Sequence, residues 1–457
     1  MIDHRTREAT GRLTRFVHDA TTGTLRPALI TTARRHVADT LACILAGAGS
    51  DAVRMATAAA GSSGRSDHGH PIPGVGRVLD PTWAALITGV AAHVEDFDDT
   101  SVSMRGHPSA PVLSALVPAA YTLDMPGDAF LLAYAVGVEA AAKLGRLLGT
   151  AHTMRGWHTM STVGALGAVC ACAKAHGLGE DEIARAIGIG ASFAGGLVGN
   201  FGTMVKGLHC GKAAWTGVVA VELARKGFEA NPGILEAEDG FVQVFGDRAG
   251  AAADGLASLG APWDLLEPGI DIKIYPSCNC THPAVDAAID LAHSGRVVPD
   301  RIRRIRCWAS AECVRYLVCP IPTTPLQAKF SMPYCVATAL VRGRLGPREF
   351  TPDAVRDERV SGLMPRVSLE ARAADRREDE PDLEVELDDG TVIRLNVPAP
   401  KGTPANPPSW ADVESKFLEG GEGVLPVPVL RDALALVGRL DRLESVRPLF
   451  DRLTPAS

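Results

Sequence analysis

Segments with the apolar spacing of an α-helix follow one another through the first half of the sequence. In the first of them Ile30, Ala33, Val37, Leu41 and Leu45 recur three or four residues apart, which places them on one face of a helix. The same spacing predicts further helices over 83–94, 110–123, 128–148, 158–175, 181–193 and 209–226. We therefore expect this part of the chain to form an all-helical domain.

Small residues fill these helical segments, and large rings are scarce. Hydrophobic residues make up 46% of the 457 residues but aromatic residues only 5%, and 47 glycines are spread along the chain. This hydrophobic share excludes a disordered or collagen-like chain and is enough for a sizeable core. Because alanine and glycine let helices approach closely, we expect a core of closely packed helices with few large rings.

Near Pro268 the helical spacing gives way to the alternation that is typical of strands. Two alternating runs flank Asp389-Gly390, and Asp-Gly supplies the positive φ angles of a tight turn, so these runs predict a β-hairpin. The expected strands are 301–308, 360–370, 383–387 and 393–397, with helices at 283–293 and 333–343 between them.

After a proline-rich break at 398–408, helical spacing returns over 427–440. Helix at both ends and strands in the middle predict a mainly α protein with two domains. We expect a large all-helical domain made of 1–267 and 403–457, with a smaller α+β domain, 268–402, inserted in the sequence.

Charge and hydropathy restrict the partners of the protein. The 46 lysine and arginine residues are outnumbered by 53 acidic residues, which gives a net charge of −7, so we expect no nucleic-acid partner. Residues 1–16 lack the apolar region and the small-residue cleavage site of a signal peptide. The most apolar stretch, 163–173, is too short to cross a bilayer. The sequence therefore predicts a cytoplasmic protein without a membrane partner.

The cysteines and glycine-rich motifs give no sign of a bound metal or cofactor. The ten cysteines show no framework spacing, and in a reducing compartment we expect thiols, most of them buried. Cys278, Cys280 and His282 alternate as metal ligands can, but no second ligand pair lies at zinc-like spacing. The segment 207–213 resembles a phosphate loop, yet it is one residue short and has Ala213 where a hydroxyl is needed.

The densest group of polar residues runs from His93 to Thr100 and resumes with Arg105, His107 and Ser109. One interpretation is a solvated, acidic helix end, with Ser109 capping the next helix. The other is a carboxylate that orients a nearby imidazole, the arrangement that an acid–base histidine needs.

Two further groups of polar residues lie beside glycines. His158 follows Gly156-Trp157 at a helix start, where a histidine can cap and pack or take part in chemistry. The segment 199–212 carries Lys206, His209 and Lys212 into a helix. It is either a flexible loop with solvated lysines or a site for a small anion such as a carboxylate, which helix amides and ammonium groups attract.

The segment 271–283 contains Lys273, Cys278 and His282 and lies where helical spacing ends. Small-molecule clefts form readily at domain junctions, so this segment is a candidate cleft wall. His282 precedes Pro283 and is expected to cap a helix or pack rather than to catalyse.

Taken together, these segments resemble the MmgE/PrpD family, which includes 2-methylcitrate dehydratase, cis-aconitate decarboxylase and iminodisuccinate epimerase. The matching stretches, in the expected order, are HVADTLACILAG, HVEDFDDT with GHPSAPVLSAL, GWHTMSTVGALGA, GTMVKGLHCGKAA, EDGF at 238–241, KIYPSCNCTHPAVDA and QAKFSMPYCVA. The resemblance implies a large helical domain built from both chain ends, a smaller α+β domain, a homodimer and no cofactor.

The resemblance also implies a set of active-site positions. Matched position by position, these are Asp96, Thr100, His107, His158, Lys206, Lys273 and Tyr334. A further histidine of the decarboxylase branch falls at the position of Cys278. Thr100 and Tyr334 would hydrogen-bond substrate oxygens. Further candidates for substrate binding are Lys212, Cys278 and His209.

The residues and the resemblance together suggest how such a site would work. Lys206 and Lys273 would hold a small di- or tricarboxylate and stabilise the charge that develops on it. His107 and His158 would transfer protons, which requires a pKa near the operating pH. Asp96 would orient His107.

This chemistry predicts a cofactor-independent lyase that moves a proton next to a carboxylate, by dehydration or by decarboxylation. Two alternatives stay open. One is an epimerase or isomerase of an amino- or imino-dicarboxylate such as iminodisuccinate. The other is a carboxylate-binding protein without catalytic activity.

Overall fold

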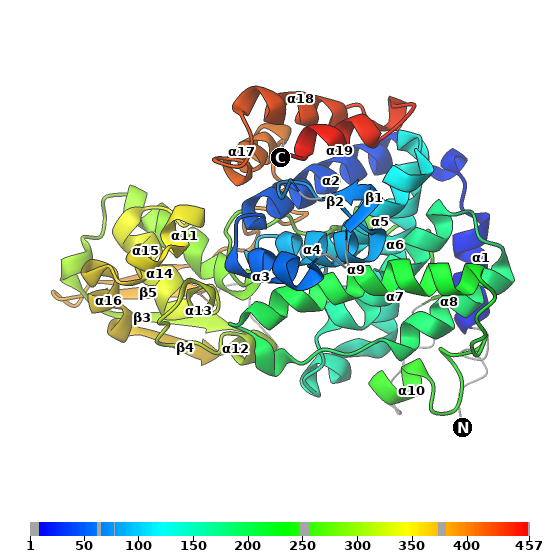
Figure 1. The fold of residues 1–457 in the computed structure, drawn as a ribbon. Helices are drawn as coiled ribbons and strands as arrows, with labels where there is room; N and C mark the ends of the chain where they lie inside the picture. The colour runs from blue at the N-terminus through cyan, green and yellow to red at the C-terminus, as the bar shows by residue number, and fades with distance from the viewer. Residues whose placement is uncertain (1–8, 62–64, 77, 247–255, 373–380, 456–457) are drawn as a thin grey trace.

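The computed structural model describes residues 9–61, 65–76, 78–246, 256–372 and 381–455, and helices dominate it (Figure 1). The prediction of a mainly α fold is confirmed. Of the N-terminal segment 1–16, residues 1–8 lie outside the described residues. Within the described ranges, no helix combines the length and the apolar character that crossing a membrane requires.

Helices from both ends of the chain build the larger part of the molecule, with α4, α5, α7 and α9 packed against one another at its centre (Figure 1). The C-terminal helix α17 returns to pack on α2. The helices are α1 (Ala9–Asp19), α2 (Pro27–Gly47), α3 (Asp51–Ala60), α4 (Pro81–Val94), α5 (Ser109–Leu123), α6 (Gly127–Met154), α7 (Val163–Ala175), α8 (Glu180–Ser192), α9 (Met204–Arg225), α10 (Phe241–Phe245), α17 (Trp410–Gly420), α18 (Val427–Val437) and α19 (Arg447–Leu453).

The smaller part contains a four-stranded sheet, in the strand order β4-β3-β5-β6. β3 pairs parallel to β4 and antiparallel to β5, and Gly390, at φ +83°, turns the chain between β5 and β6. The hairpin prediction is thus confirmed. The elements are α11 (His282–His293), β3 (Ile302–Ala309), α12 (Ala311–Tyr316), α13 (Pro325–Ala328), α14 (Met332–Arg342), α15 (Pro352–Val355), α16 (Glu358–Leu363), β4 (Val367–Ala371), β5 (Leu383–Leu387) and β6 (Val392–Leu395).

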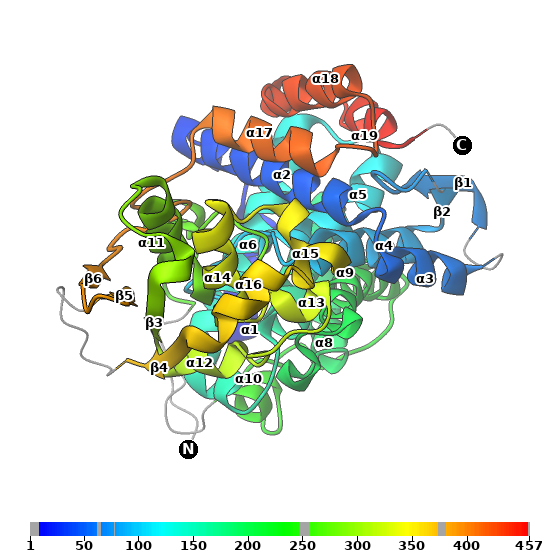
Figure 2. The same cartoon turned by 90° about the vertical axis from the view of Figure 1, so that its left-hand side faces the viewer.

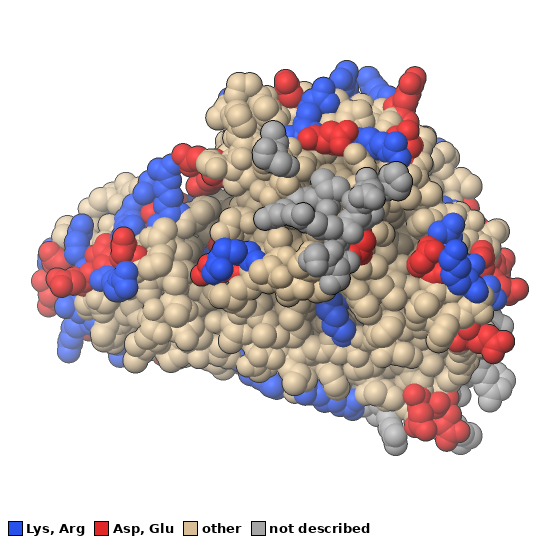
Figure 3. Space-filling view, in the orientation of Figure 1, with Lys and Arg blue, Asp and Glu red and all other residues tan. Residues whose placement is uncertain are grey.

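Helices of the smaller part face the viewer in Figure 2, with α11, α14 and α16 in front. α11 and α14 pack against each other, and they contact β5 and β4 respectively. In the space-filling view of Figure 3, basic and acidic side chains intermingle over this end of the molecule. Ion pairs join this sheet together: Arg301, just before β3, pairs with Asp388, just after β5, and Arg303 of β3 pairs with Glu386 of β5.

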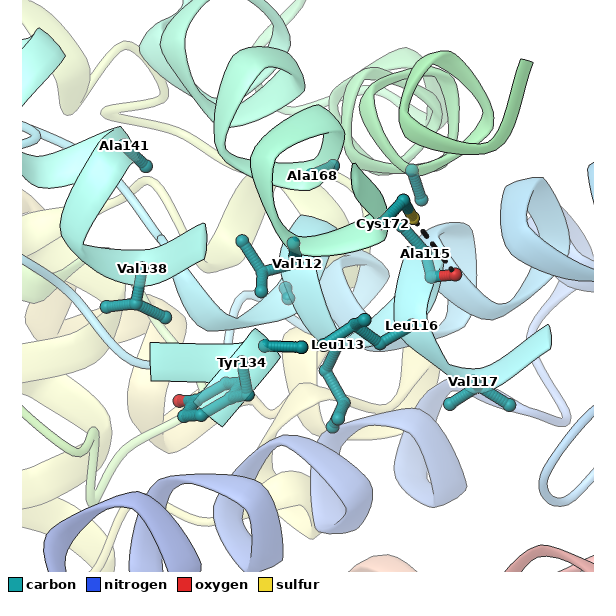
Figure 4. Close-up of a cluster of buried hydrophobic side chains, with 14 of the residues drawn as sticks. Val112, Leu113, Ala115, Leu116, Val117, Tyr134, Val138, Ala141, Ala168 and Cys172 are labelled. Atoms are coloured by element: carbon teal, nitrogen blue, oxygen red, sulfur yellow. Dashed lines mark hydrogen bonds between the residues drawn. The ribbon is translucent and has the colours of Figure 1, made fainter. Parts of the chain in front are cut away.

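The buried apolar side chains form two clusters. One draws on residues between 9 and 272 and between 413 and 453, and the other on residues between 275 and 393. Figure 4 shows part of the first cluster, with Val112 of α5, Val138 of α6 and Ala168 of α7 among its buried side chains. The domain boundaries at 267/268 and 402/403 stay predictions.

Four expectations about local structure were wrong. α7 begins at Val163 rather than at 158, and α9 begins at Met204 rather than at 209, so Lys206 lies in a helix and not in a loop. Residues 358–363 form α16, with β4 only from 367, because the spacing of Val360 and Leu363 also suits a helix. A short hairpin, β1 (Arg65–Pro71) and β2 (Val78–Leu79), lies within the part expected to be all helical.

The expectation that all ten cysteines are thiols was also wrong. Cys280 and Cys313 form a disulfide, while the other eight are free. The two sulfurs lie 33 residues apart in sequence, and α12 brings them together only after the chain has passed through β3. Local spacing therefore gave no signal of this pair.

Glycines set the distance between α4 and α9. A Cβ added at Gly89 would lie 2.7 Å from the Cα of Gly211, and one added at Gly211 would lie 2.4 Å from the carbonyl oxygen of Leu86. Real Cβ atoms do not approach other atoms this closely, so only glycine at both positions permits this contact. The site described below is built on these two helices.

We expect Gly211→Ala to lower the free energy of unfolding by ~1–3 kcal/mol, because the new methyl group forces α4 and α9 apart. The control is Gly362→Ala in α16, where an added Cβ meets nothing within 4 Å. That variant should be neutral or more stable by up to ~1 kcal/mol, since alanine is the better helix former. Urea denaturation measures both changes, and equal effects would contradict the packing argument.

Candidate active site

A cavity of about 300 Å³ opens where the two parts of the molecule meet. This size suits a small metabolite. Its wall comes from the loop after α4, the start of α9, the segment that leads into α11, and α12. The lining residues are Asp96, Thr100, Ser101, Val102, Arg105, Gly106, His107, Thr153, Trp157, His158, Thr159, Val198, Phe201, Lys206, Asp271, Lys273, Cys278, Asn279, Cys280, Glu312, Cys313, Tyr316 and Phe330.

The carboxylate of Asp96 lies between two ammonium groups. α4 ends at Val94, and Asp96 takes a left-handed backbone conformation with φ +51°. Lys206 Nζ donates to Asp96 Oδ1 at 2.6 Å, and Lys273 Nζ lies 3.2 Å from Oδ2. Burial opposes ionisation of this carboxyl, but the two lysines outweigh it and hold its pKa well below the usual range.

Lys206 is buried rather than solvated. It lies in the first turn of α9, whose N-cap is Thr203, and only 5% of its surface is exposed. Its Nζ also lies 2.6 Å from His93 Nε2, while His93 Nδ1 lies 2.9 Å from Asp98 Oδ1. The sequence interpretation of this segment as a flexible loop is therefore wrong for Lys206.

His107 is held by a backbone carbonyl and not by Asp96. Its Nδ1 lies 2.8 Å from the carbonyl oxygen of Asp99, which can only accept, so Nδ1 carries the proton and Nε2 is the acceptor. Asp96 Oδ1 is 4.0 Å from Nε2, too far for a hydrogen bond. The expected orienting contact from Asp96 is thus not formed.

Burial and the nearby lysines lower the pKa of His107 to about 3, although Asp98 opposes the shift. The imidazole is therefore neutral near pH 7. A neutral imidazole with a free Nε2 can take up a proton from a molecule in the cavity.

His158 also lines the cavity and pairs with a second histidine. Its Nδ1 is 2.9 Å from Nδ1 of His209, so one ring donates and the other accepts. Burial and then Lys206 lower the pKa of His158 well below its ordinary value, and that of His209 to about 4. His209 does not line the cavity, and its contact is with His158.

A short backbone bridge brings Thr100 and Lys273 to the same wall. The peptide N–H of Thr100 donates to the carbonyl of Asp271 at 2.9 Å, and the reverse bond is 2.8 Å. This bridge joins the loop after α4 to the segment from which Lys273 reaches Asp96. Thr100, Lys273 and Cys278 all line the cavity.

Besides His209, two more of the expected binding residues do not line the cavity. Tyr334 is fully buried in the second apolar cluster, and its hydroxyl donates to the carbonyl of Glu349. It lies in the first turn of α14, whose buried face packs against α11, so its ring joins that core. Lys212 Nζ donates to the carbonyl of Gly195 at 2.9 Å and does not line the cavity.

The sequence did not single out a polar group at one side of the cavity. Arg105, which has φ +56°, pairs with Glu312 of α12 at 2.9 Å. Glu312 also accepts from Thr153 at 2.8 Å and from Tyr316 at 2.9 Å. Arg105 belongs to the polar group recognised in the sequence, whereas nothing in the sequence around Glu312 marked it as a cavity residue.

Sulfur atoms line the cavity beside this group. Burial raises the pKa of the Cys278 thiol to about 11, so it stays protonated at neutral pH. Cys280 is bound to Cys313 and therefore cannot serve as a thiolate ligand with Cys278 and His282. His282 is buried with its ring edge-on to Tyr275.

Another group has the spacing of metal ligands. Donor atoms of His93, Asp96, Asp98 and His107 lie within 4.8 Å of one another. The ammonium of Lys206, however, is 2.6 Å from both His93 Nε2 and Asp96 Oδ1. A cation provided by the chain already occupies the position between these two ligands.

The buried histidines predict a stability that falls in mild acid. Burial lowers the pKa of His107 and His282 to about 3 and of His152 and His209 to about 4. In the unfolded chain a histidine binds its proton below about pH 6.5. Between about pH 6.5 and 4 the unfolded state therefore binds more protons than the folded state, and the free energy of unfolding decreases as the pH is lowered. Burial raises the pKa of Asp39 to about 6. This shift favours the folded state in mild acid, but it concerns one group against the histidines named above.

We expect the free energy of unfolding to be lower at about pH 5 than at pH 7.5 by at least ~2 kcal/mol. Urea denaturation at both pH values measures this difference. His107→Gln removes one of the groups, so it should reduce the difference. The same free energy at both pH values would show that these imidazoles protonate freely in the folded protein.

Over most of its length the chain is similar to known protein families and to individual enzymes. The MmgE/PrpD N-terminal domain matches residues 11–253, and the MmgE/PrpD C-terminal domain matches residues 275–438. Cis-aconitate decarboxylase of Homo sapiens is 30% identical over 383 residues, which cover 80% of this chain and 78% of that protein. The enzyme of Mus musculus is 30% identical over 387 residues, which cover 80% of this chain and 77% of that protein. The enzyme of Aspergillus terreus is 26% identical over 411 residues, which cover 83% of this chain and 82% of that protein.

Proposed function

Because the chain belongs to the MmgE/PrpD family, we propose that it is a lyase acting on a small di- or tricarboxylate, with cis-aconitate as the first candidate substrate. The named relatives, which are cis-aconitate decarboxylases, support a reaction of the decarboxylase or dehydratase type. The reaction would need no cofactor and would take place in the cavity between the two parts of the molecule.

One arrangement carries this proposal: a neutral imidazole with a free Nε2 opens onto the same cavity as two buried ammonium groups. His107 provides the imidazole, and Lys206 and Lys273 provide the charge. Buried among side chains, where the dielectric is lower than in water, ammonium groups stabilise an anion more strongly than they would in water. The arrangement therefore suits a reaction in which negative charge develops beside a carboxylate.

In the decarboxylation that we propose, the bond between the substrate carbon and one carboxylate breaks. The carboxylate leaves as carbon dioxide, and the electron pair of the broken bond takes up a proton at carbon. His107 would deliver this proton after the bound carboxylates have raised the pKa of its imidazole. His158, in its pair with His209, is the second candidate for proton transfer.

In a dehydration, the alternative reaction, His107 Nε2 would remove a proton next to the carboxylate instead of delivering one.

Lys206 and Lys273 are already bound to Asp96. A substrate carboxylate would thus share these ammonium groups with Asp96 rather than meet free ones. Thr100 and the protonated thiol of Cys278 would complete the binding wall, and Arg105 could exchange Glu312 for a substrate carboxylate. Tyr334 and Lys212 take no part in this proposal, since neither lines the cavity.

Proton NMR of the purified protein in deuterated buffer tests the reaction. A panel of cis-aconitate, 2-methylcitrate and aspartate-like dicarboxylates distinguishes the alternatives. Decarboxylation releases carbon dioxide and places deuterium on carbon, whereas dehydration creates an alkene that absorbs in the ultraviolet. Epimerisation leaves the mass of the compound unchanged except for hydrogen exchange. An absence of turnover and exchange across the panel would favour a carboxylate-binding protein.

We expect His107→Gln and Lys206→Met each to lower kcat/KM on the active acid by at least ~10²-fold, because they remove the imidazole that transfers the proton and one of the two ammonium groups. The control is Lys226→Met at the exposed end of the same helix, which should retain full activity. Full activity of both His107→Gln and Lys206→Met would contradict the proposed mechanism.

A further inference from the structure

Three successive backbone carbonyls after α4 each accept a hydrogen bond from a different lysine. Lys329 Nζ donates to the carbonyl of Glu95 at 2.8 Å, Lys273 Nζ to that of Asp96 at 2.8 Å, and Lys416 Nζ to that of Phe97 at 2.7 Å. The three lysines come from three segments that are far apart in sequence. Lys273 reaches the candidate cavity, whereas Lys329 and Lys416 do not line it.

Lys329 and Lys416 each join the loop after α4 to the segment that carries Lys273. Lys329 Nζ also donates to the carbonyl of Pro276 at 3.1 Å and lies 2.9 Å from the Glu95 carboxylate. Lys416 Nζ also donates to the carbonyl of Lys273 at 2.9 Å and lies 2.6 Å from the Asp39 carboxylate. Each ammonium group thus has three partners: two carbonyl oxygens that accept its hydrogen bonds, and one carboxylate with which it forms an ion pair.

Physical chemistry explains why lysines occupy these places. The three carbonyls follow the C-terminal end of α4, where the helix dipole attracts cations, and a buried carbonyl outside a helix needs a donor from elsewhere in the chain. The left-handed conformation of Asp96 ends α4 abruptly and leaves the following carbonyls buried. A buried ammonium is tolerated where it is hydrogen-bonded and paired. Lys329 and Lys416, 1% and 6% exposed, each have two carbonyl acceptors and one carboxylate partner.

We propose that Lys329 and Lys416 are positioning residues that hold the loop of Asp96 and the segment of Lys273 together from two sides. Lys329 follows α13 in the smaller part of the molecule, and Lys416 belongs to the C-terminal helix α17. The distances between Asp96, Lys206 and Lys273 therefore depend on contacts from both. The consequence for catalysis rests on the proposed function, but the consequence for loop order does not.

The first test measures the loop without any substrate. Hydrogen exchange of peptides covering 95–101 should be about tenfold faster in Lys416→Met and in Lys329→Met than in the unaltered protein, because the loop opens locally. The control is Lys143→Met. Lys143 is equally buried and also uses three partners, the carbonyl of Pro262 and the carboxylates of Glu139 and Asp264, but it does not contact this loop.

A second variant separates positioning from stability. Lys416→Met leaves the Asp39 carboxylate buried without its partner, whereas the double variant Asp39→Asn/Lys416→Met does not. The double variant should thus regain part of the lost stability while exchange in 95–101 stays fast, since the carbonyls of Phe97 and Lys273 still lack their donor. Unchanged exchange in this peptide in both Lys416→Met and Lys329→Met, or an equal increase in Lys143→Met, would overturn the proposal.

The third readout uses the acid that the unaltered protein turns over. We expect Lys416→Met and the double variant to lower kcat by about tenfold or more with a smaller change in KM, because misplaced charges lose transition-state stabilisation before they lose binding. Lys143→Met should keep its kcat. A normal kcat together with fast exchange in 95–101 would overturn the catalytic part. If the unaltered protein turns over no acid, the proposed function fails, and the exchange comparison still decides whether the lysines hold the loop.

Discussion

The Asp96 carboxylate between Lys206 and Lys273 is the interaction on which the rest of the candidate site depends. Taking a carboxylate out of water is costly unless ion pairs and hydrogen bonds replace its hydration. Here the carboxylate follows α4, one ammonium lies in the first turn of α9, and the other lies in the segment before α11. The three charges can meet only when the helical core and the junction to the smaller part have both formed.

The chemistry of the cavity follows from that arrangement. Burial and the same two ammonium groups keep His107 neutral near pH 7, while the carbonyl of Asp99 selects the tautomer whose Nε2 accepts. The net charge of the whole chain is −7, but a small anion in the cavity meets local lysines rather than the average of the surface. An acceptor for a proton and a place for negative charge thus lie in one small volume.

The small residues of the core make this geometry possible. Gly89 and Gly211 let α4 and α9 approach until their backbones touch, and these helices carry His93 and Lys206. Larger residues at the crossing would separate the ends of the two helices by more than a hydrogen bond allows. The small residues of the helical segments, which at first indicated only a closely packed core, therefore bear directly on the site.

Local patterns allowed a good part of the fold to be predicted, and the rest required long-range contacts. The mainly α character and the hairpin at Asp389-Gly390 follow from spacing and turn chemistry, which act over a few residues. The start of α9 was missed because its first residues include glycines that also suit a loop. Tyr334 matched a family position, but the packing of α14 places its ring in the second apolar cluster. The disulfide between Cys280 and Cys313 left no signal because its partners meet only through β3 and α12.

By itself the sequence determined which helices could form, where helical spacing gives way to strands, and which residue types could move protons beside a carboxylate. Only the tertiary structure decided that Asp96 pairs with two lysines instead of orienting His107, and that Glu312 faces Arg105. It also decided that Lys329 and Lys416 donate hydrogen bonds to carbonyls of the loop after α4. Hydrogen bonds and ion pairs depend on separations of a few ångströms between segments that lie hundreds of residues apart. Residue order does not encode such separations until the helices have packed.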